Sequence, residues 1–274
     1  MPLFDLDRHT RRLRRALKRR WRPNKLDFNE SYESYANHVE KLKRNHDYEE
    51  AMSLAVGGRY YAVGAIERQA LIQVGLRAEH TLIDMGCGSG RTAYGLRTYL
   101  DGRYIGYDIV PELVEYAKEK CQRSDWKFGT VDRIQIPEPD GSVDMVCFFS
   151  VFTHLLHEQS FNYLREAVRV LKPGGAIVFS FLEYGIPGHW KIFEQALADQ
   201  EDKAPLNVFL AREIIEVWAG HLDCNVDMLE SGDAQYVEFD VPLALEDGTV
   251  LEGKQQFGQS LCVLRQKRTW RQPG

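Results

Sequence analysis

The feature that most constrains the fold of this chain is a glycine-rich turn that follows a short apolar segment. Residues 81–90 read TLIDMGCGSG, so Gly86, Gly88 and Gly90 occupy alternate positions ahead of a helix expected from Arg91. Because glycine has no Cβ, such a turn lets the backbone approach a ligand closely where a parallel strand passes into its helix. We therefore expect a parallel α/β sheet with a nucleotide-type ligand at one edge.

Apolar runs and amphipathic stretches alternate downstream of this turn and predict the same fold. Strands are expected at 81–85, 103–110, 127–129, 142–150, 176–183, 224–229 and 257–265, and helices at 62–75, 91–100, 111–122, 157–171 and 207–221, with Pro173-Gly174-Gly175 as the turn before the fifth strand. This alternation is typical of an α/β, doubly wound, mostly parallel seven-stranded sheet. The sequence Glu246-Asp247-Gly248-Thr249 predicts the turn of an inserted β-hairpin near the C-terminus.

The glycine spacing limits the ligand of this turn. It is GxGxG, whereas dinucleotide-binding turns have GxGxxG, and no Gly-Lys-Ser/Thr ending places a lysine against a phosphate. Asp84 precedes the first glycine by two residues, where a carboxylate repels a pyrophosphate but suits an ammonium group. Asp108 ends the second expected strand, the position of the acid that binds ribose hydroxyls in doubly wound folds. The pattern indicates a nucleoside with a cationic amino-acid tail and no phosphates.

Four blocks along residues 57–183 carry a resemblance to a family. They are IDMGCGSG, YIGYDI, the stretch at 132–146 that contains IPEPDGSVDMV, and LKPGGAIVFS. In this order and spacing they resemble class I S-adenosylmethionine-dependent methyltransferases, and they are similar to the bacterial enzymes that modify small molecules or glycans. The resemblance implies a Rossmann-like methyltransferase domain at 57–274, a helical N-terminal extension at 1–56, and S-adenosyl-L-methionine as cofactor, with S-adenosyl-L-homocysteine as product.

The resemblance also implies the cofactor-binding residues, which are Tyr61, Asp84, Gly86, Gly88, Gly90, Asp108, Ile109, Asp132 and Ser150. Within this set, the glycines line the methionine and ribose portions, Asp84 lies near the amino group and Asp108 binds the ribose hydroxyls. Asp132 is the acid that meets the adenine amino group, although Arg133 departs from the small residue usual beside it. Simpler interpretations stay open: Asp84 and Asp108 as capping acids, Asp132 as a loop carboxylate, and Tyr60 and Tyr61 as packing aromatics.

The acceptor side is less defined. Methyl transfer from a sulfonium is a displacement, and a hydroxyl acceptor needs a base whereas a carboxylate or thiolate does not. His154, four residues after the fourth expected strand, is the first candidate base, with orientation of the following helix as its alternative role. Tyr184 and His189, in a loop expected after the fifth strand, are alternative bases or acceptor contacts.

Two motifs that this sequence lacks limit the chemical class of the methyl acceptor. The fourth strand ends in Phe-Ser-Val-Phe, whereas the methyltransferases that act on exocyclic amines of nucleic acids carry Asp/Asn-Pro-Pro-Tyr there. The stretch SVFTH lacks the paired acids of metal-dependent methyltransferases, so no metal is expected. Both points favour an oxygen acceptor without a metal.

A basic N-terminal arm stands apart from these blocks. Residues 8–25 hold ten Lys/Arg and no acid, a segment of charge +10 in a chain of net charge −5, which leaves −15 for the rest. Residues 8–22 predict an amphipathic helix with Leu13, Leu17 and Trp21 on one stripe, and residues 24–50 are expected to be helical in parts. The arm could lie on an anionic membrane, dock on the acidic body or a second subunit, or bind nucleic acid, which the acidic body disfavours.

Together these patterns predict a methyltransferase that acts on an oxygen of a sugar, a glycan or another small metabolite. A binding protein without transfer chemistry, and a methyltransferase for a peptide or RNA, remain alternatives; the oligomeric state is left open. The five cysteines form no CxxC pair, which is typical of reduced thiols. No apolar run predicts a spanning helix or a secretory signal, so a cytoplasmic location is expected, with peripheral membrane association left open.

Overall fold

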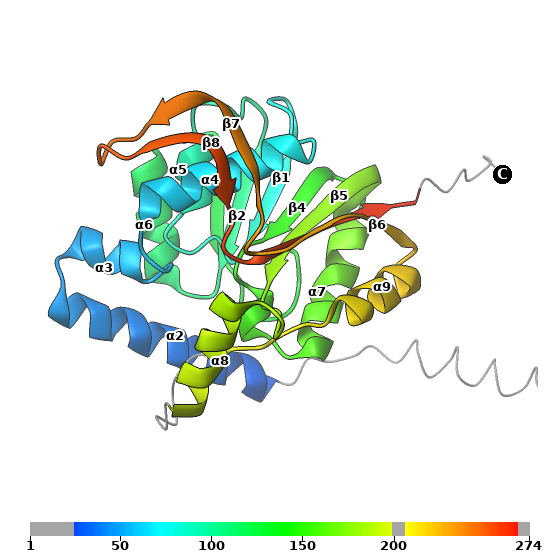
Figure 1. Ribbon diagram of the computed structural model, residues 1–274, viewed down its shortest axis with the longest axis horizontal. Helices are drawn as coiled ribbons and strands as arrows, with labels where there is room; N and C mark the ends of the chain where they lie inside the picture. Colours follow the sequence, from blue (N-terminus) through cyan, green and yellow to red (C-terminus); the bar gives the residue numbers. More distant parts are fainter. Residues whose placement is uncertain (1–24, 199–205, 268–274) are drawn as a thin grey trace, which may run out of the picture.

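The computed structural model of this 274-residue chain describes residues 25–198 and 206–267 (Figure 1). The expected basic helix over residues 8–22 lies outside the described residues. The helices are α2 (Lys25–Asn45), α3 (Tyr48–Leu54), α4 (Tyr60–Gln73), α5 (Arg91–Leu96), α6 (Pro111–Cys121), α7 (His157–Val170), α8 (Pro187–Ala198) and α9 (Arg212–His221), with a 3-10 turn at Phe152–His154. The strands are β1 (Leu82–Met85), β2 (Tyr104–Asp108), β3 (Lys127–Thr130), β4 (Val143–Phe148), β5 (Leu171–Phe181), β6 (Cys224–Glu230), β7 (Gln235–Ala244), β8 (Val250–Gln256) and β9 (Ser260–Gln266).

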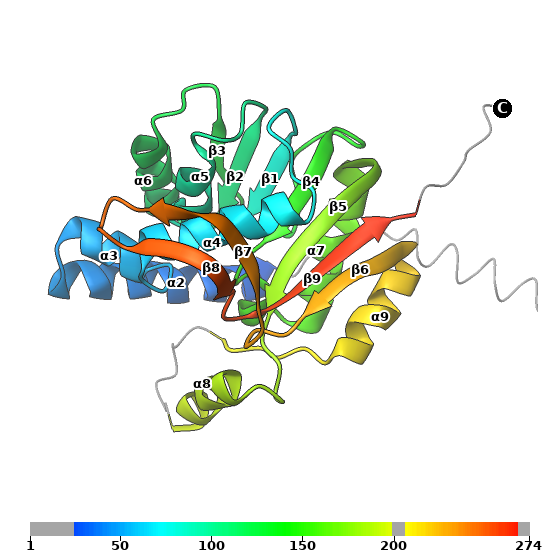
Figure 2. The same cartoon turned by 45° about the horizontal axis from the view of Figure 1, so that its top comes forward.

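Seven strands form one sheet in the order β3-β2-β1-β4-β5-β9-β6 (Figure 2). The first five pair in parallel, whereas β9 is antiparallel to both β5 and β6. Every residue of β1 and β2 is buried, as is usual for central parallel strands covered on both faces. The expected doubly wound, mostly parallel seven-stranded sheet is confirmed.

Helices cover both faces of this sheet. Because side chains alternate along a strand, Ile83 of β1 packs into the cluster that includes α7 and α9, and its neighbour Leu82 packs into the cluster that includes α4 and α5. Such alternation places a hydrophobic core on each side of the sheet and leaves its strand ends open for a ligand.

The expected β-hairpin is confirmed as β7 and β8, which pair with each other outside the main sheet. It lies against α4, where Gln73 accepts a hydrogen bond from Glu238 N at 2.8 Å and donates one to Tyr236 O at 3.1 Å. Val237, Phe239 and Leu251 of the hairpin join the core cluster that α4 and α5 share with the sheet. The hairpin is therefore an added layer on one face.

The structure corrects three sequence-based boundaries. Pro173-Gly174-Gly175 lies within β5 as an irregularity, since β5 pairs with β4 on both sides of it. The helix expected over 207–221 begins only at Arg212. The loop expected after the fifth strand contains α8, a helix with Pro187 at its start, a position that proline favours.

The N-terminal helices α2 and α3 pack on α6. Val39 and Met52 share a buried cluster with Leu113, and Glu49 binds Lys120 at 2.7 Å. The segment around residue 56 then leads directly into α4 beside the glycine turn. A domain boundary at residue 56 stays a prediction, and the described part of the extension lies close to the expected ligand site.

Candidate active site

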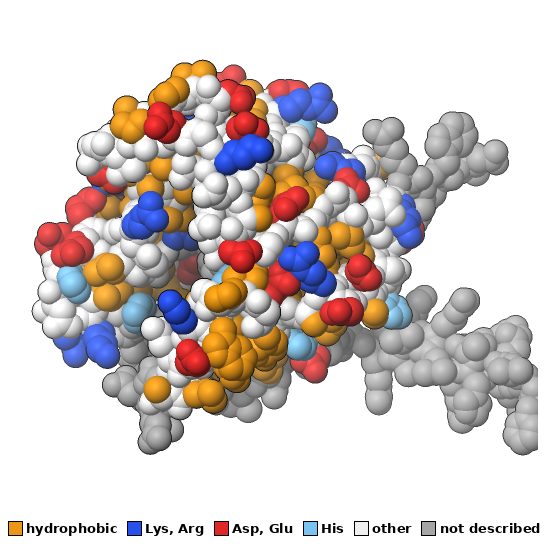
Figure 3. All heavy atoms as spheres, in the orientation of Figure 1, with side chains coloured by type: hydrophobic (Ala, Val, Ile, Leu, Met, Phe, Trp, Pro, Cys, Tyr) orange, Lys and Arg blue, Asp and Glu red, His pale blue; other side chains and the backbone are white. Residues whose placement is uncertain are grey.

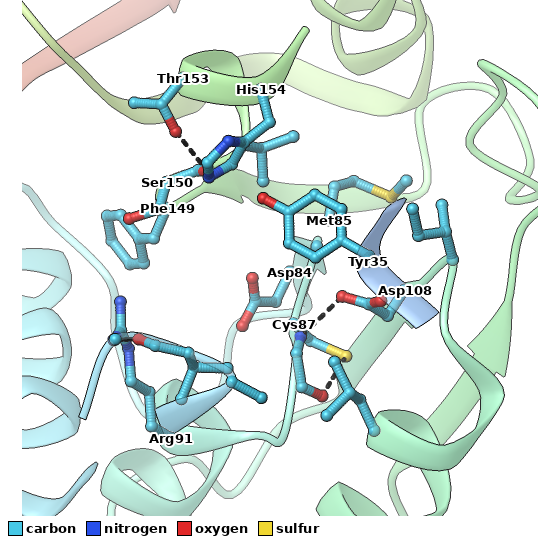
Figure 4. A pocket seen from close by; sticks show the side chains of 18 of the residues that line it. Tyr35, Asp84, Met85, Cys87, Arg91, Asp108, Phe149, Ser150, Thr153 and His154 are labelled. Carbon is cyan, nitrogen blue, oxygen red and sulfur yellow. Dashed lines mark hydrogen bonds between the residues drawn. The ribbon is translucent and has the colours of Figure 1, made fainter. Parts of the chain in front are cut away.

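A cavity of about 400 Å³ lies at the carboxyl ends of β1, β2, β4 and β5. Open parallel sheets bind ligands at this edge, and this volume lies within the usual range for small-molecule sites. Seven of the expected site residues line it: Asp84, Gly86, Gly88, Asp108, Ile109, Ser150 and His154. Figure 4 shows Asp84 and Asp108 near the glycine turn, with Tyr35 lying between Asp108 and His154.

The glycine turn has the backbone that its sequence predicts. Gly88 (φ 53°) and Gly90 (φ 82°) adopt left-handed conformations that L side chains rarely take. A Cβ at Gly90 would lie 2.6 Å from the Cβ of Ala117, so this glycine permits α6 to pack against the start of α5. Gly86 and Gly88 line the cavity, whereas Gly90 is absent from its lining and contributes through packing.

Asp108 is fixed by backbone donors on both carboxylate oxygens. Gly88 N donates to Oδ2 at 2.8 Å and Val110 N donates to Oδ1 at 2.9 Å. Burial raises the pKa of Asp108, while these N–H groups act in the opposite direction. Each carboxylate oxygen can accept a second hydrogen bond, so the side chain can still accept from ligand hydroxyls.

Asp84 is completely buried at the end of β1 and accepts a hydrogen bond from the Tyr104 hydroxyl at 2.6 Å. Burial raises its pKa to about 7, and the negative charge of Glu67 adds to this shift. An uncompensated buried carboxylate is costly, so this position favours a cationic partner in the cavity.

The segment before α4 covers the glycine turn. Ser89 donates to Met52 O at 2.8 Å, and Tyr60 donates to Ser89 O at 2.9 Å. Arg91 contacts Val56 O and pairs with buried Glu67 at 2.7 Å. These bonds tie the segment around residues 52–60 to the turn and help to enclose that end of the cavity.

His154 lies at the other end of the cavity and has a defined tautomer. Its Nδ1 lies 2.6 Å from Leu206 O, and because a carbonyl only accepts, Nδ1 carries the proton. Burial lowers the pKa of His154, and His38 adds to the shift. The neutral ring therefore leaves Nε2 as a proton acceptor, and His154 lines the cavity.

Tyr35 and His38 of α2 are cavity residues that the sequence did not reveal. The ring of Tyr35 meets that of His154 edge-to-face, with centroids 5.2 Å apart. Burial raises the pKa of Tyr35, and the Asp108 charge contributes to this. The tyrosine-rich composition of residues 24–50 was the only signal, because no sequence period shows which face of α2 meets the sheet edge.

A third missed residue, Gln259, reaches the cavity from the turn before β9. Ser150, held at φ 57°, donates its N–H to Ser180 Oγ at 2.8 Å. The Ser180 hydroxyl in turn donates to Gln259 Oε1 at 2.7 Å. This direction of donation leaves the Nε2 amide of Gln259 as a donor group, and no sequence motif marks it.

Five expected site residues are absent from the lining of the cavity. They are Gly90, described above, and Tyr61, Asp132, Tyr184 and His189. Tyr61 packs against Tyr60 and Tyr94, and Tyr184 stacks on Phe209. Asp132 pairs with Arg133, and its side chain is 79% exposed. His189 accepts a hydrogen bond from Glu183 N at 2.9 Å on Nδ1, so Nε2 carries the proton toward Gly258 O at 3.0 Å. With both nitrogens engaged, His189 anchors α8 between β5 and the turn before β9.

The described residues form neither a metal site nor a membrane span. Within residues 25–198 and 206–267, no group of three or more His, Cys, Asp or Glu side chains could hold a metal ion. Among the same residues, no helix is both long and apolar enough to cross a membrane. All five cysteines are buried free thiols.

Comparison with known proteins shows similarity to methyltransferases. The family model described as a methyltransferase domain matches residues 83–179. A methyltransferase from a Haloferax volcanii complex with the activator Trm112 superposes with a TM-score of 0.57 at 20% identity, over 88% of this chain and 98% of that one. A magnesium protoporphyrin IX methyltransferase from Synechocystis, solved with bound S-adenosylhomocysteine, gives a TM-score of 0.55 at 14% identity, over 85% of this chain and 94% of that one.

Relatives by sequence are also methyltransferases. The 27-O-demethylrifamycin SV methyltransferase of Amycolatopsis mediterranei is 33% identical over 106 residues, which are 37% of this chain and 38% of the relative. A fatty-acid O-methyltransferase of Mycolicibacterium smegmatis is 32% identical over 154 residues, 55% and 52% of the two chains. The match thus spans about half or less of these relatives. The resemblance of this chain to class I S-adenosylmethionine-dependent methyltransferases is confirmed in sequence and in fold.

Proposed function

We propose that this protein transfers a methyl group from S-adenosylmethionine to an oxygen of a small-molecule acceptor, with His154 as general base. The observation that carries the proposal is that two buried acids at the glycine turn and a histidine of defined tautomer line one cavity. The matched methyltransferase domain and the relatives that methylate small molecules support the same reaction class.

The cofactor end follows from the acids. Asp108 would accept hydrogen bonds from the ribose hydroxyls, since both its oxygens are oriented by backbone N–H groups. Asp84 would face the ammonium group of the methionine portion, because a cation offsets the cost of its buried charge. The glycine turn offers no lysine for a phosphate, which suits a phosphate-free nucleoside.

The acceptor end follows from His154. When bound, the cofactor supplies a methyl group on a positively charged sulfur. As the acceptor oxygen forms its bond to the methyl carbon and the sulfur–carbon bond breaks, Nε2 of His154 would take the hydroxyl proton. The resulting imidazolium would be stabilised by the Nδ1–H bond to Leu206 O, and S-adenosylhomocysteine leaves as a neutral sulfide.

The acceptor class is a sugar, a glycan or another small metabolite with a hydroxyl. Gln259 and Tyr35 line the same cavity as His154. The Gln259 amide is a candidate to orient that hydroxyl, and the Tyr35 ring is a candidate to hold the His154 ring in place. We further propose that residues 1–56 form an extension of the methyltransferase domain, with residues 8–22 as the segment that would meet an anionic surface.

The test is formation of S-adenosylhomocysteine from S-adenosylmethionine with a panel of sugars, phenols and hydroxy acids. We expect acceptor-dependent product from at least one class, abolished by Asp108→Ala. Tight binding of the cofactor without product from any acceptor, including peptides and RNA, would instead identify a binding protein without transfer chemistry.

A further inference from the structure

Helix α8 is an apolar helix with little to cover it. Of its twelve residues only His189 is buried, although it carries Trp190, Ile192, Phe193 and Leu197. Trp190 is 42% exposed and Leu197 67% exposed. A soluble helix usually buries such a stripe against the core, because water-exposed apolar surface is unfavourable.

The apolar residues of α8 form one continuous arc that begins in the cavity. At about 100° per residue, Ile192, Phe193, Leu197 and Trp190 follow one another around roughly 160° of the helix. Ile192 lines the cavity, at one end of the arc. Trp190 and Leu197 are exposed to solvent, at the other end.

Aromatic rings extend this arc beyond the helix. Phe193 contacts Trp190 and Tyr184 with ring centroids 5.0 and 5.5 Å apart, and Tyr184 stacks on Phe209 at 4.6 Å. Leu206, whose carbonyl accepts the hydrogen bond from His154, precedes Phe209 by three residues and is half exposed. We define the five residues of this region that reach solvent, Tyr184, Trp190, Phe193, Leu197 and Leu206, as the α8 surface, with buried Phe209 beneath Tyr184. Figure 3 shows hydrophobic side chains gathered over α8, beside a hollow in the surface.

We propose that the α8 surface binds the apolar chain of the methyl acceptor while the acceptor's hydroxyl reaches His154. The occupant is inferred from continuity, because the apolar arc runs from the cavity wall to solvent without a charged side chain within it. Lys191 and Gln195 lie on the opposite side of α8, at the same helical spacing. Glu194 borders the solvent end of the arc, where its carboxylate accepts a hydrogen bond from Trp190 Nε1 at 3.0 Å. The inference rests on the proposed function and adds the substrate class, an amphipathic molecule with an alkyl or similar apolar tail.

The physical basis is burial of the tail. Each methylene of the acceptor that moves from water onto such a surface raises the affinity of the acceptor by up to about fourfold. A polar acceptor such as a free sugar would leave the α8 surface exposed and gain nothing from it. Chain length of the acceptor is therefore the variable that this surface controls.

The experiment measures binding of phenol, 4-butylphenol and 4-hexylphenol to the full-length protein saturated with S-adenosylhomocysteine, by calorimetry, and their methylation with S-adenosylmethionine. All three probes carry the same hydroxyl, so they differ only in the tail. We expect affinity, and kcat/KM where turnover occurs, to rise at least tenfold from phenol to 4-hexylphenol. In the double variant Trp190→Gln/Leu197→Gln this gain should fall severalfold. The matched control Val217→Gln, an exposed apolar residue of α9, should keep the full gain.

Equal affinities along the series, no binding of any alkylphenol, or an undiminished gain in the double variant would overturn the proposal. So would vesicle binding: if neutral phosphatidylcholine vesicles sediment the protein through Trp190 and Leu197 while the alkylphenol gain is unaffected, the α8 surface is a membrane contact. The proposed function is judged separately, by S-adenosylhomocysteine affinity and by product from any acceptor. The first readout does not depend on the α8 surface, and the second does not require an acceptor with an apolar tail.

Discussion

The proposed cofactor end and the proposed acceptor end of the cavity are held in place by different parts of the molecule. At the cofactor end, Asp84 and Asp108 end two neighbouring central strands, and Asp108 is fixed by backbone N–H groups of the glycine turn. At the acceptor end, Tyr35 comes from α2, His154 from the 3-10 turn after β4, and Gln259 from the turn before β9. Local backbone geometry builds the first end, and contacts between distant segments build the second.

This difference suggests which end can vary. A carboxylate held by backbone bonds cannot move without disrupting the sheet edge, so the cofactor end suits a fixed ligand. Side chains on helices and loops can be exchanged at lower structural cost, so the acceptor end can be adapted to different substrates. Substitutions at the two ends should therefore affect different kinetic constants.

The largest effect is expected at the acceptor end. His154→Ala removes the proposed base, and kcat with a hydroxyl acceptor should fall by about 10²- to 10⁴-fold. Cofactor affinity should stay within about twofold of the wild type, because the Tyr35 ring lies between His154 and Asp108 (Figure 4). Initial rates of S-adenosylhomocysteine formation, with calorimetry for the cofactor, measure both; full turnover in the variant would refute the role of His154 as base.

The next effect concerns pH and the cofactor end. Burial raises the pKa of Asp84 to about 7, so in the free protein its carboxyl is protonated below that pH and ionised above it. Since the ammonium group of the ligand needs the carboxylate, cofactor affinity should fall roughly tenfold from pH 8 to pH 6. The variant Asp84→Asn should bind the cofactor weakly at both pH values. A wild-type affinity that is the same at pH 8 and pH 6 would contradict a contact between Asp84 and the ammonium group of the cofactor.

The same carboxyl has the opposite effect on the stability of the free protein. Its folded pKa lies above the unfolded value, so the folded state binds the proton more tightly between about pH 4 and pH 7. The contribution of Asp84 to the free energy of unfolding should therefore decrease as pH rises through this window. Denaturant unfolding of wild type and of Asp84→Asn at several pH values isolates this contribution. If the free energy of unfolding changed with pH equally in the two proteins, the raised pKa of Asp84 would be contradicted.

The smallest effect is expected for Tyr35, which packs edge-to-face on His154. An aromatic contact of this kind is worth about 0.5–1.5 kcal/mol, so Tyr35→Leu should lower kcat about two- to tenfold. Tyr35→Phe keeps the ring and serves as the matched control, with kcat close to wild type. A loss in Tyr35→Phe as large as the loss in Tyr35→Leu would show that the hydroxyl, rather than the ring, is what matters.

The sequence predicted the cofactor end better than the acceptor end, for a physical reason. Gly88 and Asp108 are adjacent in space because β1 and β2 pair in parallel, and each residue has a recognisable local pattern. Tyr35 and Gln259 meet the cavity only through packing between elements that are far apart along the chain. No local pattern encodes such contacts, so these residues were not predicted.

Helix α8 shows the same limit in secondary structure. The chain enters this helix through Gly185-Ile186-Pro187-Gly188, a sequence typical of a loop, and the apolar arc of the helix does not face a core. Asp132 and His189 illustrate the converse, because residues of the expected type lie at the expected positions yet are absent from the cavity lining. An exposed ion pair with Arg133 and an anchoring role for α8 hold them elsewhere.

The most direct test of the central claim, that one cavity binds the cofactor through the two strand-end acids, is the affinity for S-adenosylhomocysteine. Calorimetry on wild type, Asp108→Ala and His154→Ala, with circular dichroism to confirm folding, separates the two ends. We expect Asp108→Ala to weaken binding about hundredfold, or about 2.7 kcal/mol, and His154→Ala to leave it within about twofold. An Asp108→Ala protein that folds and binds S-adenosylhomocysteine as tightly as wild type would contradict the assignment of this cavity.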